Sequence, residues 1–304
     1  MNHIVPNSLA TPWIACFVLF IAIGQPSVAQ DVWQQHVGKA GESGWRCHVI
    51  QPDPNDHGPD GINFHDWNND GFVDVLVNYE EGKFSRLFFN LGVKKCHSTW
   101  SDWIEFQHGP CEDSGIGDLD NDGDIDYVAN GGWIFFNPGG ESVRDAKKWV
   151  RMNLFDKEQR VPLVTDVDGD GLNDLVVGAQ LWFKQPSDDK HQAKNWKRYK
   201  LGESKWPMNC IRRDVDADGD IDFIVADRRS EIFWLENPGK AKLYKPWPRK
   251  MLHPHKSMFI AVGDINGDSI DDIAIAGGQE GEIKWQRKLT VLIRKNRSGI
   301  PAFE

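Results

Sequence analysis

The sequence predicts an all-β fold built from repeated four-stranded sheets, and three observations support that prediction. A short acidic segment recurs five times at nearly even spacing. Each copy is followed by short apolar and aromatic runs that end in turn residues. Beyond the N-terminal region, no stretch shows a convincing helical pattern. A fixed period of short strands is typical of repeat folds made of sheets.

The acidic segment is clearest in "GDLDNDGDID" (117–126), which holds five aspartates and one asparagine. Its relatives are "HDWNNDGFVD", "TDVDGDGLND", "RDVDADGDID" and "GDINGDSIDD". Aligned on their first aspartate, the copies recur at intervals of 48 to 52 residues and begin at Asp66, Asp118, Asp166, Asp214 and Asp264. Five copies at such even spacing indicate one structural unit per copy.

Three strand-like runs accompany each acidic segment. An apolar run comes directly after it, at 73–78, 125–130, 173–178, 221–226 and 271–276. An aromatic run follows, at 86–90, 133–140, 181–186 and 232–239. A run that begins with tryptophan closes the period, at 45–50, 103–108, 149–154, 196–201 and 247–252. β-Branched and aromatic residues bounded by Gly, Asn, Asp or Pro are typical of short strands.

A period of about 50 residues with four strands predicts the blades of a β-propeller. Five four-stranded blades are the simple count, and six or seven are the alternatives. The N-terminal run 45–50 has no acidic loop before it, so we expect it to complete the last sheet, within residues 258–294. Such closure would pair both free sheet edges. The tail 288–296 could instead supply the third or fourth strand of the last blade.

The N-terminus predicts export. Residues 13–23, "WIACFVLFIAI", are too few to span a bilayer comfortably and precede the small-x-small triplet Ser27-Val28-Ala29. We interpret residues 1–29 as a signal peptide and 30–304 as a single propeller domain, with an uncleaved anchor as the alternative. The mature chain shows no membrane span and is expected to be secreted, periplasmic or at the cell surface.

The cysteines fit such a compartment. Four remain beyond residue 30, at Cys47, Cys96, Cys111 and Cys210. An even number permits two disulfides with three alternative pairings, while buried free thiols are the other interpretation.

The acidic loops predict calcium sites. Numbering each loop from its first aspartate, positions 1, 3, 5 and 9 carry only Asp, with Asn replacing it at position 3 in two copies. Glycine at position 6 would allow a sharp bend, although the fifth copy has Ser269 there. Side-chain oxygens at odd spacing suit Ca²⁺, which takes six to eight oxygen ligands, and they suit Mg²⁺ less well. The predicted ligands, for up to five ions, are Asp66, Asn68, Asp70, Asp74, Asp118, Asp120, Asp122, Asp126, Asp166, Asp168, Asp170, Asp174, Asp214, Asp216, Asp218, Asp222, Asp264, Asn266, Asp268 and Asp272.

Two other interpretations of these loops are weaker. An EF-hand requires Glu at position 12 and flanking helices, whereas position 12 here is Val, Ala or Ile within a strand-like run. A turn rich in Asp and Asn needs no metal, but five copies with the same oxygen positions exceed what turns alone require. The predicted ligand positions account for 18 of the 45 acidic residues, so the remaining 27 are outnumbered by 35 Lys and Arg.

"GDLDNDGDIDYV", "TDVDGDGLNDLV" and "RDVDADGDIDFI" resemble the FG-GAP/VCBS repeats of integrin-α-type propellers, and "WLENPG" and "FFNPGG" resemble a secreted bacterial branch of that family. The resemblance covers residues 45 to about 294 and implies calcium in the hairpin between the first and second strands of a blade. Asn68, Asn266 and Ser269 depart from the pattern, as does the absence of clear Phe-Gly and Gly-Ala-Pro signatures.

Function is less sharply indicated. The first hypothesis is a binding or adhesion module for polysaccharide or extracellular protein. The alternative is a polysaccharide lyase or sugar dehydratase, because some proteins with similar repeats are such enzymes. No catalytic motif is present, so no catalytic residue is assigned and we lean towards a non-enzyme. The basic stretch 194–200 is interpreted as a solvated outer strand and not as a nucleic-acid site.

Tryptophan is abundant, with 14 residues. Two periodic series are assigned to the core between blades: Trp133, Trp182, Trp234 and Trp285, and Trp45, Trp103, Trp149, Trp196 and Trp247. The off-period residues Trp67, Trp100 and Trp206 are the candidates for exposed contacts.

Overall fold

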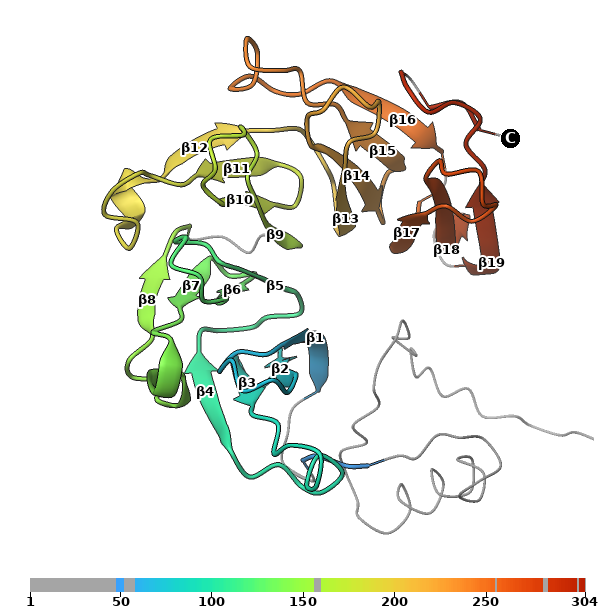
Figure 1. The fold of residues 1–304 in the computed structure, drawn as a ribbon. Helices are drawn as coiled ribbons and strands as arrows, with labels where there is room; N and C mark the ends of the chain where they lie inside the picture. Colours follow the sequence, from blue (N-terminus) through green and yellow to red (C-terminus); the bar gives the residue numbers. More distant parts are fainter. Residues whose placement is uncertain are drawn as a thin grey trace, which may run out of the picture.

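Five antiparallel sheets stand side by side in an arc around a common centre (Figure 1). The computed structural model describes residues 48–51, 58–155, 160–254, 256–280, 284–299 and 301–303. Four sheets have four strands and the fifth has three. The first strand of each sheet lies towards the centre, and the fourth strand, where present, lies at the outer side. The predicted all-β repeat architecture is therefore confirmed, while a closed ring and the blade count remain predictions.

The strands follow the sequence period. The first sheet contains β1 (Pro59–His65), β2 (Asp74–Tyr79), β3 (Phe84–Phe88) and β4 (Trp103–Gln107). The second contains β5 (Ser114–Gly117), β6 (Asp126–Ala129), β7 (Trp133–Phe136) and β8 (Val150–Asn153). The third contains β9 (Pro162–Thr165), β10 (Asp174–Val177), β11 (Leu181–Lys184) and β12 (Lys197–Lys200).

The fourth sheet contains β13 (Pro207–Arg213), β14 (Asp222–Asp227), β15 (Ile232–Leu235) and β16 (Arg249–His253). The fifth contains β17 (Phe259–Gly263), β18 (Asp272–Glu280) and β19 (Lys284–Leu292). The tail therefore supplies the third strand of the fifth sheet. Two short 3₁₀ helices, η1 (Gly140–Arg144) and η2 (Ala193–Asn195), precede the outer strands of the second and third sheets.

Every acidic loop connects the first strand of a sheet to the second. In each hairpin the residue before the loop pairs with the aspartate at position 9, as His65 does with Asp74 and Thr165 with Asp174. The second strands β2, β6, β10 and β14 are buried along their whole length, which explains their continuous apolar runs. The loops thus gather at one end of the sheets, as the resemblance implied.

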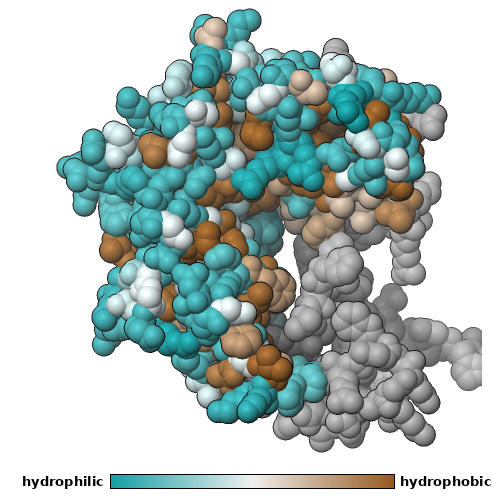
Figure 2. Space-filling view, viewed as in Figure 1, coloured by the Kyte–Doolittle hydropathy of each residue, from teal (hydrophilic) through white to brown (hydrophobic). Residues whose placement is uncertain are grey.

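Hydrophobic cores lie between neighbouring sheets. Each core joins one face of a sheet to the facing side of the next, and position 2 of the acidic loop contributes to it through Trp67, Leu119, Val167 or Val215. Figure 2 shows the same division, with a mainly hydrophilic outer rim and hydrophobic residues where sheets meet and towards the centre. Packing sheet on sheet around a centre is what a propeller requires.

The free face of the first sheet contacts the N-terminal segment. Ile50 packs there with Val75 and Trp100 in a fifth cluster. The backbone N–H of Trp100 donates to the carbonyl of Ile50 at 2.7 Å, just as that of Trp247 donates to Leu201 at 2.7 Å. Leu201 directly follows the outermost strand of the third sheet, so Ile50 holds the position of a residue that ends a preceding blade. Residues 45–47 of the predicted closing strand lie outside the described residues, and 48–50 are not a strand.

The predictions for two tryptophans near β4 are wrong, Trp103 as a core residue and Trp100 as an exposed contact. Trp103 is 41% exposed, whereas Trp100 is 6% exposed and its indole N–H donates to the Cys96 carbonyl at 2.9 Å. Trp149, Trp196 and Trp247 are likewise buried, and each donates to a carbonyl four to six residues earlier. The buried series therefore includes Trp100 and not Trp103. Trp100 lies three positions before the start of β4, whereas Trp149 and Trp196 directly precede their strands.

The other aromatic predictions have mixed outcomes. Trp67 is 1% exposed, so its prediction as an exposed contact is also wrong. Trp206 is half-buried, with the Arg229 guanidinium 4.1 Å from its ring centroid. Trp182 and Trp234 are buried as predicted. Trp45 and the side chain of Trp285 lie outside the described part of the chain.

The described cysteines are free thiols. Cys96 is exposed, while Cys111 and Cys210 are buried. Cys47 lies outside the described residues. Within the described ranges, no helix has the length and apolar character needed to cross a membrane.

We predict that Trp100→Ala lowers the free energy of unfolding by about 3–5 kcal/mol, because it empties a buried aromatic site. The matched control is Trp103→Ala, three residues away, which should cost about 1 kcal/mol because the ring is exposed and mainly contacts Arg86. Urea unfolding of both variants in calcium buffer measures the difference. Equal losses of unfolding free energy in the two variants would contradict the assignment of Trp100, and not Trp103, to the core.

Candidate calcium loops

All five acidic loops have the same hydrogen-bond pattern. The two carboxylate oxygens of the aspartate at position 1 accept the backbone N–H groups of positions 5 and 6, and Oδ1 of the aspartate at position 5 accepts that of position 7. The position-1 bonds are 2.8–3.2 Å long and involve Asp66, Asp118, Asp166, Asp214 and Asp264. The repeat in sequence is therefore a repeat in loop geometry.

Positions 4 and 6 take left-handed backbone conformations. Position 6 has φ between 86° and 98° at its four glycines and 66° at Ser269. An added Cβ would meet nothing within 4 Å at Gly71, Gly123, Gly171 or Gly219. Ser269 therefore costs only the left-handed conformation, about 1 kcal/mol, and the fifth loop keeps its shape. Position 4 was not recognised from the sequence, although Asn69 and Asn121 there have φ of 56° and 58°.

The aspartate at position 9 is buried in every loop. Its Oδ2 accepts the backbone N–H of position 2, and its Oδ1 accepts a backbone N–H just beyond the third strand. Asp126, for example, accepts from Leu119 at 2.6 Å and from Asn137 at 2.8 Å. Equivalent pairs of bonds are made by Asp74, Asp174, Asp222 and Asp272.

Burial strongly perturbs the carboxyl groups of Asp74, Asp126, Asp174 and Asp222. Burial raises the pKa of Asp126 to about 8, and the charges of Asp120 and Asp122 add to the rise, while the two backbone N–H bonds oppose it. Burial likewise raises the pKa of Asp174 and Asp222 to about 7 and that of Asp74 to about 6. A cation beside such carboxylates would favour their charged form.

Three loops bring three carboxylates together. In each, one oxygen from every member lies within 4.8 Å of the others. The clusters are Asp118, Asp120 and Asp122; Asp166, Asp168 and Asp174; and Asp214, Asp216 and Asp218. Because Ca–O distances are about 2.3–2.6 Å, oxygens that share one ion lie at most about 5 Å apart. The first and fifth loops, with Asn68 and Asn266 at position 3, form no such cluster among the described residues.

The donor set fits a hard cation. Every clustered side chain offers oxygen, and an oxygen that accepts one N–H retains a second lone pair. Oδ1 of Asp168 and Oδ1 of Asp216 are buried without a hydrogen-bond partner. The Asp168 side chain is 6% exposed and belongs to the third cluster. A buried carboxylate oxygen without a hydrogen-bond partner costs desolvation free energy, and a bound cation at this position would offset that cost.

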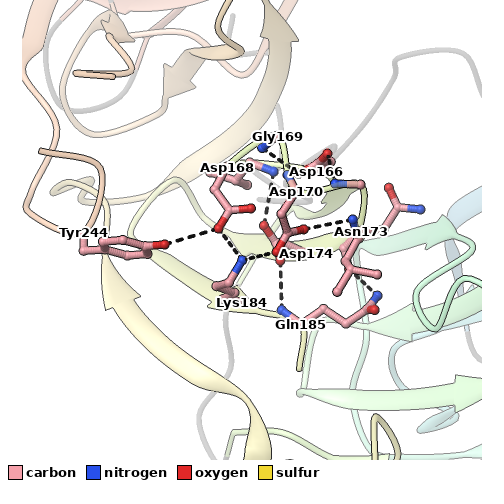
Figure 3. A network of polar contacts seen from close by, with 12 residues as sticks. Asp166, Asp168, Gly169, Asp170, Asn173, Asp174, Lys184, Gln185 and Tyr244 are labelled. Carbon is pink, nitrogen blue, oxygen red and sulfur yellow. Dashed lines mark hydrogen bonds and ion pairs between the residues drawn. The ribbon is translucent and has the colours of Figure 1, made fainter. Parts of the chain in front are cut away.

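The three clusters differ in the basic side chains that already contact them. In the second loop, His191 Nε2 lies 2.7 Å from Asp120 Oδ2. In the third loop, the Lys184 ammonium contacts both Asp168 and Asp170, and Tyr244 donates to Asp168 Oδ2 at 3.4 Å (Figure 3). Although burial opposes the shift, the contacts with both aspartates raise the pKa of Lys184 above its ordinary value.

The aspartates of the fourth loop differ from those of the second and third loops in their contacts with basic side chains. Within the described ranges, none of Asp214, Asp216 and Asp218 takes part in an ion pair. Burial raises the pKa of Asp216, and the charges of Asp218, Glu236 and Asp214 raise it further. Among the residues that the structure describes, this cluster therefore differs from the other two in lacking a direct contact with a basic side chain, although the charge of Arg294 acts on Asp214 and Asp216.

Side chains also connect neighbouring loops. Asn121 Nδ2 donates to the Gly171 carbonyl at 3.1 Å, and Asn173 Nδ2 donates to the Asp118 carbonyl at 2.7 Å. Asn69 Nδ2 donates to Asp124 Oδ1 at 3.3 Å. The first three loops therefore form a continuous hydrogen-bonded row at one end of the sheets.

A second polar cluster lies between the first two sheets. The Ser85 hydroxyl contacts His108 Nε2 at 2.8 Å and the Tyr127 hydroxyl at 2.7 Å, and it donates to Asn78 Oδ1 at 2.9 Å. Burial lowers the pKa of His108 to about 4 and raises that of Tyr127 well above its usual value. Ser85 and Tyr127 are fully buried, so a substrate cannot reach them in this structure. The cluster is therefore better explained as a satisfied polar core than as a catalytic site.

Comparison with known proteins identifies the repeat. Residues 160–192 match the FG-GAP repeat and residues 214–275 match the FG-GAP-like repeat, so these two segments are similar to FG-GAP repeats. No curated protein matches the chain. Similar solved structures exist at low identity: the V. cholerae biofilm matrix protein Bap1 (15% identity, TM-score 0.41), BBS1N in complex with ARL6DN (10%, 0.44) and a putative phosphatase from Bacteroides thetaiotaomicron (10%, 0.39).

Each match spans less than two thirds of the compared protein. The matches cover 76%, 76% and 71% of this chain and 37%, 65% and 58% of the three proteins, in the same order. At such identities and scores, they carry no conclusion about activity.

We predict that Asp74→Asn lowers the free energy of unfolding by about 1–3 kcal/mol in EDTA at pH 7.5. An amide NH₂ would face one of the two N–H groups that the carboxylate now accepts, from Trp67 and Asn90, and leave it unpaired. The control is Asp70→Asn in the same loop. Its more exposed side chain accepts one backbone N–H, which an amide oxygen can also accept, and forms a partly exposed ion pair with Arg144. This substitution should cost about 0.5 kcal/mol. Similar losses for the two variants would argue against the role of position 9.

Proposed function

We propose that this chain is a secreted, calcium-binding β-propeller that acts as a binding or adhesion module for a polysaccharide or an extracellular protein. The observation that carries the calcium part is the identical loop geometry in all five hairpins, with three carboxylates gathered in three of them. The predicted signal peptide, residues 1–29, lies outside the described residues and supplies the proposed route of export.

In this proposal the twenty predicted loop side chains hold up to five calcium ions. The second, third and fourth loops bind most tightly, because each offers a three-carboxylate cluster. The first and fifth loops bind more weakly, since an asparagine at position 3 removes one charge. Each ion would neutralise the repulsion within its loop and fix the hairpin between the first and second strands.

We further propose that the arc closes into five blades through the N-terminal strand, with residues 45–50 completing the fifth sheet. The position of Ile50 on the first sheet supports this, because Leu201 has the equivalent position between the third and fourth sheets. Ile265, at position 2 of the fifth loop, is 51% exposed, whereas its four equivalents are buried in inter-sheet cores. A contact between the first and fifth sheets would bury it as well.

A polysaccharide lyase or sugar dehydratase remains the second hypothesis. In the described histidine–tyrosine cluster Tyr127 is fully buried and His108 half-buried, which favours binding over catalysis. Incubation with acidic polysaccharides, followed by absorbance of unsaturated uronates, separates the two functions. Turnover that is lost in Tyr127→Phe would establish the enzyme instead.

We predict that the purified chain retains bound calcium after dialysis against micromolar calcium, and that EDTA lowers its melting temperature by about 5 °C or more. A single site at a hundredfold excess over its dissociation constant contributes about 2.7 kcal/mol, and about 2 °C follows from each kcal/mol in a domain of this size. Elemental analysis and calorimetry measure the two quantities. Metal-free protein with the same melting temperature in both buffers would refute the proposal.

We also predict that Lys184→Met tightens calcium binding by the third loop roughly tenfold, which corresponds to about 1.4 kcal/mol, because the variant removes an ammonium that competes for Asp168 and Asp170. The matched control is Lys197→Met, which removes the same charge from the cross-strand neighbour of Lys184. Titration calorimetry of both variants with calcium tests the effect. Identical isotherms would show that Lys184 does not compete with the ion.

A further inference from the structure

A cleft of about 780 Å³ lies between the third and fourth sheets. Its walls are the outer strand β12, the connection that follows it and the β14–β15 turn, with Arg249 of β16 reaching in. The second strands β10 and β14 begin at acidic loops and end at this side, so the cleft lies at the opposite end of the sheets from those loops. Its volume lies within the range of ligand sites.

Hydrogen bonds within the lining preform the cleft, and some of them join each sheet to the connection between β12 and β13. Arg249 donates to Glu231 Oε1 at 2.9 Å through Nη2 and to the Ser230 hydroxyl at 3.2 Å, and it also donates to the Glu203 carbonyl. Gln180 Nε2 donates to the Ser204 carbonyl and hydroxyl at 3.0 and 2.9 Å. These bonds connect both walls, so little ordering would be required on binding.

The charge of the cleft is positive on balance. Arg198 and Lys205 are exposed and take part in no ion pair in the described part of the chain. Lys200 pairs with Glu203, but both side chains are more than half exposed, so water weakens this pair. Glu231 is already paired with Arg249. Arg198 and Lys205 are therefore available to an anionic ligand.

The same lining disfavours a nucleic acid. A nucleic-acid strand carries a phosphate at every nucleotide, about every 3.4 Å along the axis of a DNA duplex, so several phosphates would meet Glu203 and Glu231. Base stacking needs a free aromatic face. The Tyr199 ring instead packs against Trp182 and Tyr244, with centroids 4.9 and 4.7 Å apart.

An acidic polysaccharide fits both features of the lining. Its carboxylates are spaced along a chain of neutral hydroxyl groups, so they could reach Arg198 and Lys205 while the hydroxyls donate to Glu203 or exchange hydrogen bonds with Ser230. The geometry points to this cleft as a binding site for a uronate-containing polysaccharide, with Arg198 and Lys205 as the residues that pair with its carboxylates. The inference rests on the proposed binding function and names its ligand class.

The test is titration calorimetry of the full chain, in calcium buffer, with a hyaluronan oligosaccharide, in which glucuronate alternates with N-acetylglucosamine. A chitin oligosaccharide of the same length is the uncharged control, and a single-stranded DNA oligonucleotide is the nucleic-acid control. We expect binding of hyaluronan that weakens with added salt, and much weaker binding of the other two. Equal affinity for chitin, or tighter binding of DNA, would overturn the proposal.

The variant Arg198→Gln/Lys205→Gln should weaken hyaluronan binding at least tenfold. The matched control Lys94→Gln/Lys95→Gln removes two exposed charges from the first sheet's connection and should change it less than twofold. Melting temperatures verify that both variants fold. Equal affinities for the two variants would place the ligand elsewhere.

Calcium binding separates the two proposals. A chain that binds calcium but not hyaluronan would refute only the cleft. A chain that binds hyaluronan through Arg198 and Lys205 but no calcium would refute only the calcium proposal.

Discussion

The buried aspartate at position 9 of each acidic loop is the constraint on which the architecture depends. One of its oxygens fixes position 2 of the loop, and the other fixes the chain just beyond the third strand. The first contact matters for packing, because position 2 carries the apolar side chain that enters the next inter-sheet core, as Trp67 and Leu119 do. A single carboxylate thus connects the hairpin, the sheet and the neighbouring sheet. Its desolvation is costly, and the two N–H bonds offset part of that cost.

The sequence predicted the loops and the second strands well because their determinants are local. All hydrogen bonds of the position-1 aspartates span five residues or fewer, and the second strands are buried on both faces, so each leaves a compact pattern. The fully regular period also made the sheet architecture predictable. Trp103 was misassigned because the connection before β4 places Trp100 three residues ahead of its strand. The spacing of tryptophans alone cannot reveal that shift.

The chemistry that distinguishes one loop from another could not be predicted, because it depends on long-range contacts. His191 contacts Asp120 across 71 residues, and Tyr244 contacts Asp168 across 76. Lys184 lies in the aromatic run of the third repeat, and the equivalent positions in the second and fourth repeats are Phe136 and Glu236. The loop motif therefore does not predict a lysine beside the third loop. The five copies share their geometry and differ in their electrostatics. The sequence motif predicts the shared geometry but not the electrostatic differences between the loops.

The proposed calcium loops and the proposed anion-binding cleft lie far enough apart to affect each other's electrostatics only weakly. Eighteen carboxylates occupy the predicted ligand positions of the loops at one end of the sheets, while the cleft at the other end carries unpaired cations. A strand of four residues, such as β10, separates the ends by about 13 Å. That distance exceeds the Debye length of about 8 Å at physiological salt, so the loops would repel an anionic ligand in the cleft only weakly. Calcium in the loops would reduce even this repulsion. A chain that gathers its acids at one end of its sheets can therefore present a cationic surface at the other, despite a net charge of −10.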